Sequence, residues 1–305
     1  MLIGRAVGLT DTGRRRRQNE DAFFCDPPLF AIADGMGGAQ AGELASRLAA
    51  AAIEEAAPAV SDEEGVVGVV RTANARIFER SLRDPAVAGM GTTATVALVD
   101  EQTGTLTLAH VGDSRAYRYR AAKLEQLTTD HSLVAELVRS GRLTEAEAAV
   151  HPHRSVITRA LGTEADVEVD TRTLDVAPGD LVLLCSDGLS AMVRDEEIAR
   201  VLEESAGDPH DAAESLIRAA NAAGGDDNVT VVLFEILEGD PAPRAAAAAG
   251  DGSPDRVLDP DAETSETVDD VRRHGAGKGS RWPALLLVLA LLGIAAFAVW
   301  WSLVR

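Results

Sequence analysis

The chain has 305 residues, and its 49 acidic residues outnumber its 29 lysines and arginines, which gives a net charge of -20. This charge opposes long-range attraction to nucleic acid and excludes DNA and RNA as expected partners. Only two cysteines are present, Cys25 and Cys185, which excludes a disulfide framework and favours a reduced, cytoplasmic setting.

Residues 1–237 have the patterns of one globular domain, and the N-terminus lacks the apolar stretch of a secretory signal. Short segments rich in β-branched and aromatic residues predict strands at 29–34, 92–100, 105–113, 115–120, 123–128, 167–176, 180–187 and 228–236. Helical periodicity is present at 40–57, 63–82, 132–140 and 209–223. Tight turns such as 101–104 connect antiparallel neighbours, so we expect an α+β fold and not a doubly wound parallel sheet.

The rest of the chain has a different composition. Residues 238–281 contain few large apolar side chains, which predicts a disordered linker. Residues 282–304 are free of charge, and their length suits a helix that crosses about 30 Å of hydrocarbon. Basic residues precede this span and only Arg305 follows it, so we expect a single-pass protein of the cell membrane with a cytoplasmic domain.

Acidic residues stand where several expected strands end. Asp34, Asp113 and Asp187 each close an apolar strand, and Asp226 and Asp227 precede another. If these ends meet, the carboxylates would repel one another and raise one another's pKa unless cations neutralise them. The donors are hard oxygens without a neighbouring Cys or paired His, so magnesium or manganese is favoured over zinc or copper.

A pair of such ions suits phosphoryl chemistry, since two metals polarise a water and clamp a phosphoryl group during in-line attack. The segment 12–21, TGRRRRQNED, adds arginines suited to bidentate phosphate binding. Other phosphatase and nucleotide-binding patterns are missing. Ala31 and Ala191 stand where a cysteine phosphatase needs arginine, and neither a P-loop nor a G-x-S-x-G elbow is present.

Eight segments stand out in order along the chain: RRQNED (16–21), ADGMGG (33–38), MGTTATV (90–96), HVGDSRAY (110–117), LTTDHS (127–132), VITRALG (156–162), CSDGL (185–189) and GGDDNVTVV (224–232). Together they resemble the motifs of the metal-dependent serine/threonine protein phosphatases of type 2C, in their bacterial form. The resemblance covers about residues 5–237. It implies two stacked antiparallel sheets flanked by helices, with a metal site at one end.

The resemblance also implies roles for individual residues. Asp34 would bridge two manganese or magnesium ions, the Gly35 carbonyl would bind one of them, and Asp187 and Asp227 would hold the other. Arg16 would bind the substrate phosphate.

Three further acids have implied roles around this centre. Asp113, together with Asp187, would hold a third and weaker ion, while Glu20 and Asp21 would act through metal-bound water. Met36 stands where animal members carry a proton-donating histidine, and a thioether cannot donate a proton. The general acid is therefore unassigned.

Residues 128–161 resemble the variable flap beside the active site. Its His151 and His153 are expected to be flap or surface residues and not ligands, because a hard-oxygen site has no need of imidazole.

We therefore expect a membrane-tethered, monomeric protein phosphatase that hydrolyses phosphothreonine and phosphoserine by direct attack of metal-activated water. Its expected partners are phosphorylated proteins and bacterial serine/threonine kinases. Two alternatives are open: a catalytically silent scaffold that binds phosphoproteins, and a phosphatase dedicated to an anti-sigma-factor antagonist. The intact acids and Arg16 argue against the scaffold, and no sensor domain typical of the second alternative is visible.

Overall fold

The computed structural model describes residues 1–37, 41–205 and 207–239. The expected membrane span, 282–304, and the expected linker beyond residue 239 lie outside the described residues. Within the described residues, no helix has both the length and the apolar character needed to cross a bilayer.

The strands form two antiparallel sheets, which confirms the predicted α+β class. The first has five strands in the order β1-β11-β10-β7-β8, and the second follows β2-β3-β5-β6-β9, with β4 paired to β3. The strands are β1 (Leu2–Asp11), β2 (Asp21–Asp26), β3 (Leu29–Met36), β4 (Gly91–Thr92), β5 (Ala94–Asp100), β6 (Thr105–Val111), β7 (Arg115–Arg120), β8 (Lys123–Gln126), β9 (Asp170–Asp175), β10 (Leu181–Cys185) and β11 (Val229–Leu237).

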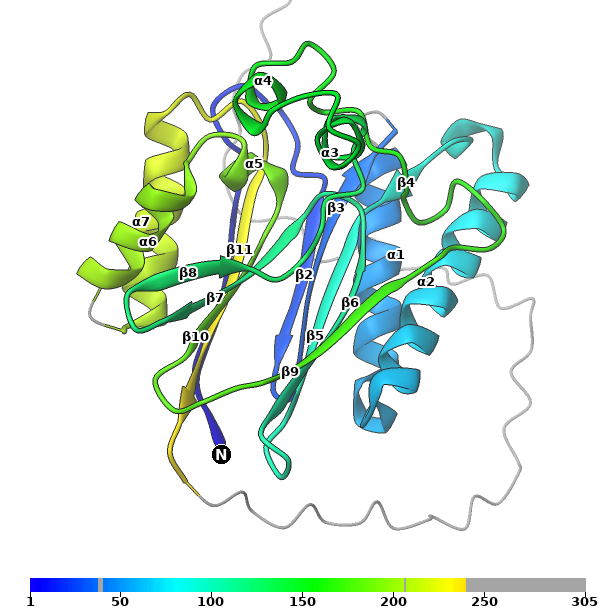
Figure 1. The fold of residues 1–305 in the computed structure, drawn as a ribbon. Coiled ribbons are helices and arrows are strands. Elements are labelled where there is room, and N and C mark those ends of the chain that lie inside the picture. Colours follow the sequence, from blue (N-terminus) through cyan, green and yellow to red (C-terminus); the bar gives the residue numbers. More distant parts are fainter. Residues whose placement is uncertain (38–40, 206, 240–305) are drawn as a thin grey trace, which may run out of the picture. The chain divides into compact units, whose positions relative to one another are not determined.

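Helices cover the outer face of each sheet (Figure 1). On one side, α1 (Ala41–Ala56) and α2 (Glu63–Arg83) share an apolar cluster with β3, β5 and β6. On the other, α5 (Asp187–Ser190), α6 (Asp195–Glu204) and α7 (Pro209–Ala222) share a cluster with β10 and β11. The short helices α3 (Leu133–Arg139) and α4 (Glu145–Ala149) belong to the expected flap.

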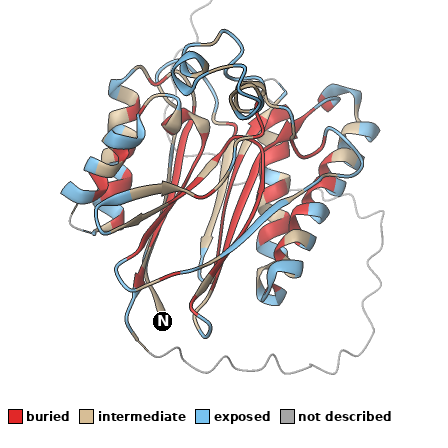
Figure 2. Ribbon diagram, in the orientation of Figure 1, coloured by how far each residue is buried: buried red, intermediate tan, exposed pale blue. Residues whose placement is uncertain are grey.

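The inner faces of the two sheets enclose a third apolar cluster. It contains Phe30 of β3 and Phe234 of β11, whose rings stack with centroids 4.0 Å apart. Buried residues line the strands and the inward faces of the helices in Figure 2. The order of layers is therefore helix, sheet, sheet, helix, as the phosphatase resemblance implies.

Four of the helices match their predicted ranges closely, and three of them begin after a residue whose side chain caps the first turn. The side chain of Asp62 accepts from Gly65 N at the start of α2, and Ser132 accepts from Ala135 N at the start of α3. Asp208 caps α7, with Pro209 in its first turn. Such caps satisfy amide groups that a helix leaves unpaired.

The structure corrects three expectations about strand ends. Asp34 lies within β3, because the strand continues to Met36 and pairs with β4. Asp113 follows β6 by two residues in a turn. Asp187 does not end a strand; it is the first residue of the short helix α5, after Ser186.

Candidate active site

Asp34 is held by the strand next to β3. Its backbone N–H donates to Thr93 Oγ1 at 2.9 Å, and its carbonyl accepts from Thr93 N at 2.9 Å and from Thr92 Oγ1 at 2.8 Å. On the other side of β3, Asp21 of β2 is the residue directly opposite Asp34 in the antiparallel register. Two of the predicted site residues are therefore neighbours across one pair of strands.

Gly35 lies where two other backbone segments come close. Its N–H donates to the Glu20 carbonyl at 3.1 Å. A Cβ at this position would collide with the carbonyl oxygens of Gly42 and Glu20, which belong to α1 and to the segment before β2. Only glycine, which has no Cβ, fits at this position.

The other acids reach the same region from the edges of both sheets. Asp187 opens α5 after β10, Asp227 precedes β11, and Asp113 lies in the turn after β6. Asp113 is buried, and its Oδ1 atom has no hydrogen-bond partner. The carboxyl of Asp21 is fixed by Thr230 of β11, whose Oγ1 donates to Asp21 Oδ2 at 2.5 Å.

The electrostatics show that these acids act on one another. Burial raises the pKa of Asp34 well above its usual range, and the charges of Asp21, Asp187, Asp113 and Asp227 raise it further. Burial, followed by the charge of Asp227, raises the pKa of Asp187 to about 6, and a side-chain hydrogen bond with Asp34 partly offsets this rise. Asp34, Asp21, Asp113, Asp187 and Asp227 therefore lie close enough to raise one another's pKa.

Two further acids are perturbed in the same direction. Burial, followed by the charges of Asp187 and Asp130, raises the pKa of Asp113 to about 8. Burial also raises the pKa of Asp21 to about 7, against the hydrogen bond from Thr230. Such shifts mean that the cluster strongly prefers added positive charge, either protons or metal cations.

Arg16 supplies some of that charge. Its Nη2 atom lies 2.7 Å from Asp227 Oδ2, and the charges of Asp227, Glu20 and Asp34 raise its pKa against the opposing effect of burial. Half of the Arg16 side chain is exposed, at 50%. The predicted phosphate-binding arginine therefore lies at the open edge of the acid cluster.

Asn228 fixes the loop that carries Arg16. Its Nδ2 atom donates to the carbonyls of Thr12 at 2.9 Å and Gln18 at 3.0 Å, and its Oδ1 accepts from Glu20 N at 2.8 Å. One buried side chain thus joins both ends of the loop to β11. The sequence analysis gave Asn228 no role, although it lies in the GGDDNVTVV motif and follows Asp227 directly.

The donor set fits hard divalent cations. It consists of carboxylates, the Gly35 carbonyl and an unpartnered Asp113 oxygen, without cysteine or histidine among them. Asp227 forms an ion pair with Arg16. Within the described residues, no group of three or more acids, histidines or cysteines is arranged to hold an ion. The chemistry of the donors suits the metal, and Arg16 supplies positive charge to one of them, Asp227.

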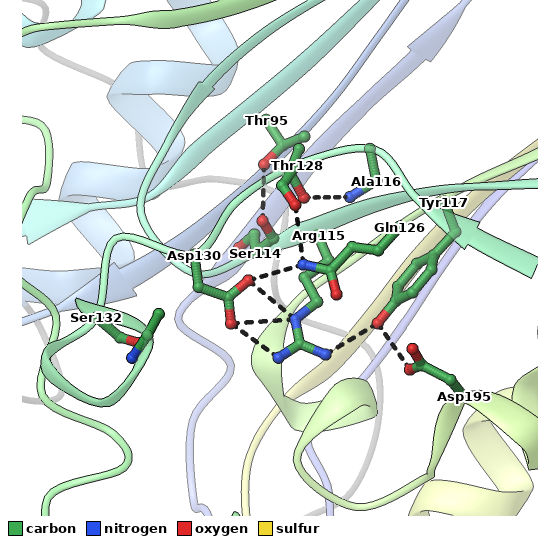
Figure 3. A network of polar contacts seen from close by, with 11 residues as sticks. Thr95, Ser114, Arg115, Ala116, Tyr117, Gln126, Thr128, Asp130, Ser132 and Asp195 are labelled. Carbon is green, nitrogen blue, oxygen red and sulfur yellow. Dashed lines mark hydrogen bonds and ion pairs between the residues drawn. The ribbon is translucent and has the colours of Figure 1, made fainter. Parts of the chain in front are cut away.

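A second network positions the turn that carries Asp113. Arg115 donates to both carboxylate oxygens of Asp130, with Nη2 2.8 Å from Oδ2, and to the Tyr117 hydroxyl at 3.0 Å (Figure 3). Tyr117 in turn donates to Asp195 of α6 at 3.1 Å. The ion pair ties the start of the flap segment to β7, two residues after Asp113.

His131 strengthens the same attachment. His131 N donates to the Gly112 carbonyl at 2.8 Å, and Gly112 N donates to His131 Nδ1 at 3.0 Å. The sequence analysis gave this contact no role. Its only signal was that Gly112 and His131 lie in the HVGDSRAY and LTTDHS motifs.

The two flap histidines contact each other. The rings of His151 and His153 lie 5.7 Å apart, and His153 N donates to His151 Nδ1 at 3.2 Å. Met36 ends β3 opposite Gly91 of β4, so a thioether does occupy the position beside Asp34 and Gly35.

Comparison with known proteins identifies the family to which this arrangement belongs. Residues 6–229 match the family model described as protein phosphatase 2C. The chain belongs to the protein phosphatase 2C family. The match spans every acid of the cluster as well as Arg16 and Asn228, so the protein phosphatase 2C domain and the site described above coincide.

Several bacterial members of the protein phosphatase 2C family are similar to this chain. The serine/threonine protein phosphatase PstP of Mycobacterium tuberculosis strain H37Rv is 41% identical over 245 residues, which cover 78% of this chain but only 46% of PstP. The serine/threonine phosphatase Stp of Listeria monocytogenes serotype 4b is 38% identical over 238 residues, with 74% of this chain and 93% of Stp covered. The chain thus spans less than half of PstP.

Solved structures of the protein phosphatase 2C family agree with the fold. The crystal structure of M. tuberculosis PstP is 40% identical and has a TM-score of 0.73, over 78% of this chain and 100% of that chain. A structure of the PstP catalytic domain in complex with two manganese ions has a TM-score of 0.71 at 37% identity, over 77% and 99% of the two chains. The two-sheet architecture is therefore that of solved bacterial phosphatases.

Proposed function

We propose that this protein is a metal-dependent protein phosphatase that removes phosphate from phosphothreonine and phosphoserine in proteins. The observation that carries the proposal is the cluster of buried, mutually repelling carboxylates with Arg16 at its open edge. The relatives named as serine/threonine phosphatases support a catalytic role and give no support to a silent scaffold.

The residues that would hold the metal are those that the sequence predicted. Asp34, the Gly35 carbonyl, Asp187 and Asp227 would hold two manganese or magnesium ions, as supported by the two manganese ions of the PstP catalytic domain. When bound, the ions supply positive charge that neutralises the carboxylates and polarises a phosphoryl group. Asp113 would join Asp187 at a third, weaker ion, supported by its unpartnered Oδ1 atom.

Glu20 and Asp21 stand behind these ligands. Glu20 is buried next to Arg16, and Asp21 is held by Thr230, so neither side chain is free to bind substrate directly. We assign both acids to supporting the centre through water.

The chain's own groups define the rest of the reaction. Arg16 binds the phosphate oxygens with its planar guanidinium, which must exchange its contact with Asp227 for the substrate. Burial raises the pKa of both thiols, that of Cys185 to about 12, so neither cysteine provides a thiolate for a covalent intermediate. Water attacks the phosphorus directly, and the bond from phosphorus to the serine or threonine oxygen breaks. That oxygen takes its proton from water, because the Met36 thioether has none to donate.

We also propose that residues 282–304 anchor the enzyme in the cell membrane with the catalytic domain on the cytoplasmic side. The support is the uncharged length of this segment and the basic residues before it. Confinement to one surface would raise the effective concentration of a membrane-bound kinase and its phosphorylated substrates. Fractionation of cells that express the chain with and without 282–304 tests this, and recovery of both forms in the soluble fraction would contradict the anchor.

The activity is tested by phosphate release from a phosphothreonine peptide. The full chain is assayed with manganese, with a chelator, and as the Asp187→Asn variant with manganese. We expect manganese-dependent turnover that both the chelator and the substitution abolish. A folded, manganese-loaded protein that binds the phosphopeptide without releasing phosphate would instead support the scaffold.

A further inference from the structure

Four consecutive arginines, Arg14 to Arg17, form an exposed basic segment that we call the arginine run. The proposed function uses only Arg16. Arg15 is also occupied, because its Nε atom lies 3.0 Å from Asp226 Oδ1. Arg14 and Arg17 form no ion pair with any acid in the part of the chain that the structure describes, so both remain available to a ligand.

The arginine run is held firmly although its side chains are exposed. Arg14 N and Arg15 N donate to the Gly225 carbonyl at 2.7 and 3.2 Å. Asn228 binds the carbonyls of Thr12 and Gln18, just outside the two ends of the run. A charged segment whose backbone is already ordered loses less conformational entropy when it binds a ligand.

The arginine run lies next to the place proposed for the substrate phosphate, because Arg16 belongs to it. Consecutive Cα atoms are about 3.8 Å apart, so the backbones of Arg14 and Arg17 lie within about 8 Å of that of Arg16. The residues that flank a phosphorylated side chain in an extended peptide have the same spacing. With the phosphate on Arg16, the backbone spacing of Arg14 and Arg17 therefore matches that of the residues that flank the phosphorylated side chain.

Because the chain is strongly acidic overall, an acidic peptide can be attracted only by a local contact with positive side chains. The chain carries a net charge of -20, which repels acidic peptides at long range. At physiological ionic strength this repulsion is screened beyond about 8 Å, whereas contacts with the arginine run are shorter. A negative charge beside the phosphate can therefore be favoured only by short contacts with positive groups such as the arginine run.

We propose that Arg14 and Arg17 form a subsite for negative groups that flank the phosphorylated residue. The enzyme then prefers phosphopeptides that carry an acidic residue or a second phosphate within about two positions of the phosphate to be removed. This inference rests on the proposed function of the same site, and it names the class of substrate that the site takes.

The test compares three peptides on the full chain with manganese. One phosphothreonine is flanked by neutral residues, by glutamates, or by a second phosphothreonine. The wild-type kcat/KM for each charged peptide should exceed that for the neutral one by about three- to tenfold, as expected for two exposed ionic contacts. The advantage should shrink as salt is raised, because exposed pairs are screened.

The variant Arg14→Gln/Arg17→Gln should lose this advantage. Its matched control is Arg71→Gln/Arg194→Gln, which removes two exposed arginines without an ion pair among the described residues, from α2 and from the start of α6. The control has the same net charge and should keep the full preference. Thermal unfolding of both variants shows whether the fold is retained, and fluorescence anisotropy gives the affinity for each peptide.

The outcomes separate this inference from the proposed function. Equal kcat/KM for all three peptides in the wild type would overturn the subsite and leave the phosphatase activity intact. Absence of turnover would contradict the activity, while anisotropy would still show whether Arg14 and Arg17 select charged peptides. The glutamate and diphosphorylated peptides distinguish a carboxylate subsite from a phosphate subsite. Binding to phosphatidylserine vesicles is measured for the wild type and for Arg14→Gln/Arg17→Gln. If the variant loses vesicle binding but keeps the wild-type peptide preference, the arginine run is a membrane contact and the subsite is refuted.

Discussion

The guanidinium of Arg16 lies 2.7 Å from the carboxylate of Asp227, so the predicted phosphate ligand and a predicted metal ligand neutralise each other. Metal at Asp227 and phosphate at Arg16 would each replace one half of this pair. The two binding events should therefore favour one another, because each frees the partner that the other needs.

Replacement of Arg16 by lysine is expected to weaken substrate binding. A point charge is kept, but the fork that binds two phosphate oxygens is lost. Loss of one charged hydrogen bond is worth about 1.5–3 kcal/mol, which corresponds to a rise in KM of about ten- to a hundredfold. Steady-state kinetics with a phosphothreonine peptide measure this, with Arg71→Lys as the control. An unchanged KM would remove Arg16 from the phosphate site.

Substitution of Gly35 by alanine is expected to be severely destabilising. The new methyl group would collide with the carbonyls of Gly42 and Glu20, which are backbone atoms and cannot rotate away. We expect a loss of about 3 kcal/mol or more, in the range of strong overpacking. Gly68→Ala is the matched control, because a Cβ there meets nothing within 4 Å and the site lies in α2. The control should gain about 0.5–1 kcal/mol from helix propensity, as measured by urea unfolding.

Asn228→Ala is expected to reduce both stability and substrate binding. It leaves the carbonyls of Thr12 and Gln18 and the Glu20 amide without their partner, at a cost of about 1–3 kcal/mol. It also releases the loop that carries Arg16, so KM should rise several-fold.

The chain provides a close control for this variant. The buried Asn74 makes the same three kinds of bond, to the carbonyls of Glu164 and Ala165 and from Gly162 N. Asn74→Ala should lower the melting temperature by a similar amount and leave KM nearly unchanged. Equal rises in KM for both variants would show that the loop effect is a general loss of stability.

The sequence predicted the α+β class, four helices and eight of the strands, because apolar periodicity and turn residues are local signals. It missed the strands β1 and β2 and the helices α4, α5 and α6. In β1, Gly4 and Gly8 reduce the strand propensity. Gly8 is needed for a tertiary reason, since a Cβ there would collide with the ring of Phe23 on β2. A contact between strands cannot be inferred from the glycine itself.

The candidate site was predictable to a similar extent. Acids at the expected strand ends predicted the cluster, and the motif resemblance implied the roles of Arg16 and Gly35. The Asn228 clamp and the Arg115–Asp130 pair join segments far apart in sequence, at separations of 210 and 15 residues, and nothing local distinguishes them from surface polar residues. Asp187 was placed on a strand because DLVLLCSD is continuous, whereas Ser186 in fact precedes a helix.

The acid cluster predicts an unusual dependence of stability on pH. The pKa is raised to about 8 for Asp113 and about 7 for Asp21, chiefly by burial, whereas an unfolded Asp has a pKa near 3.9. A carboxyl with a higher pKa in the folded chain binds protons more readily when folded. The charged carboxyl therefore lowers the free energy of unfolding fully above the folded pKa, and this loss disappears as pH falls. His110 and His131, whose pKa burial lowers, act in the opposite direction as pH falls through about 6.5, the pKa of an unfolded histidine.

With a chelator present, the melting temperature should therefore rise as pH is lowered from 8 to 6.5. Uptake of about one proton over this interval stabilises the fold by about 2 kcal/mol, or roughly 5 °C for a domain of this size. The window lies below the usual thiol pKa and reaches that of histidine only at its lower end, so the carboxyls dominate. Asp113→Asn should raise the melting temperature at pH 8 and flatten the trend. Saturating manganese should reverse it, because protons then compete with the ion for the same oxygens. Differential scanning fluorimetry measures the melting temperature at each pH. If the melting temperature of the chelated wild type falls as pH is lowered from 8 to 6.5, the acids do not share one buried cluster.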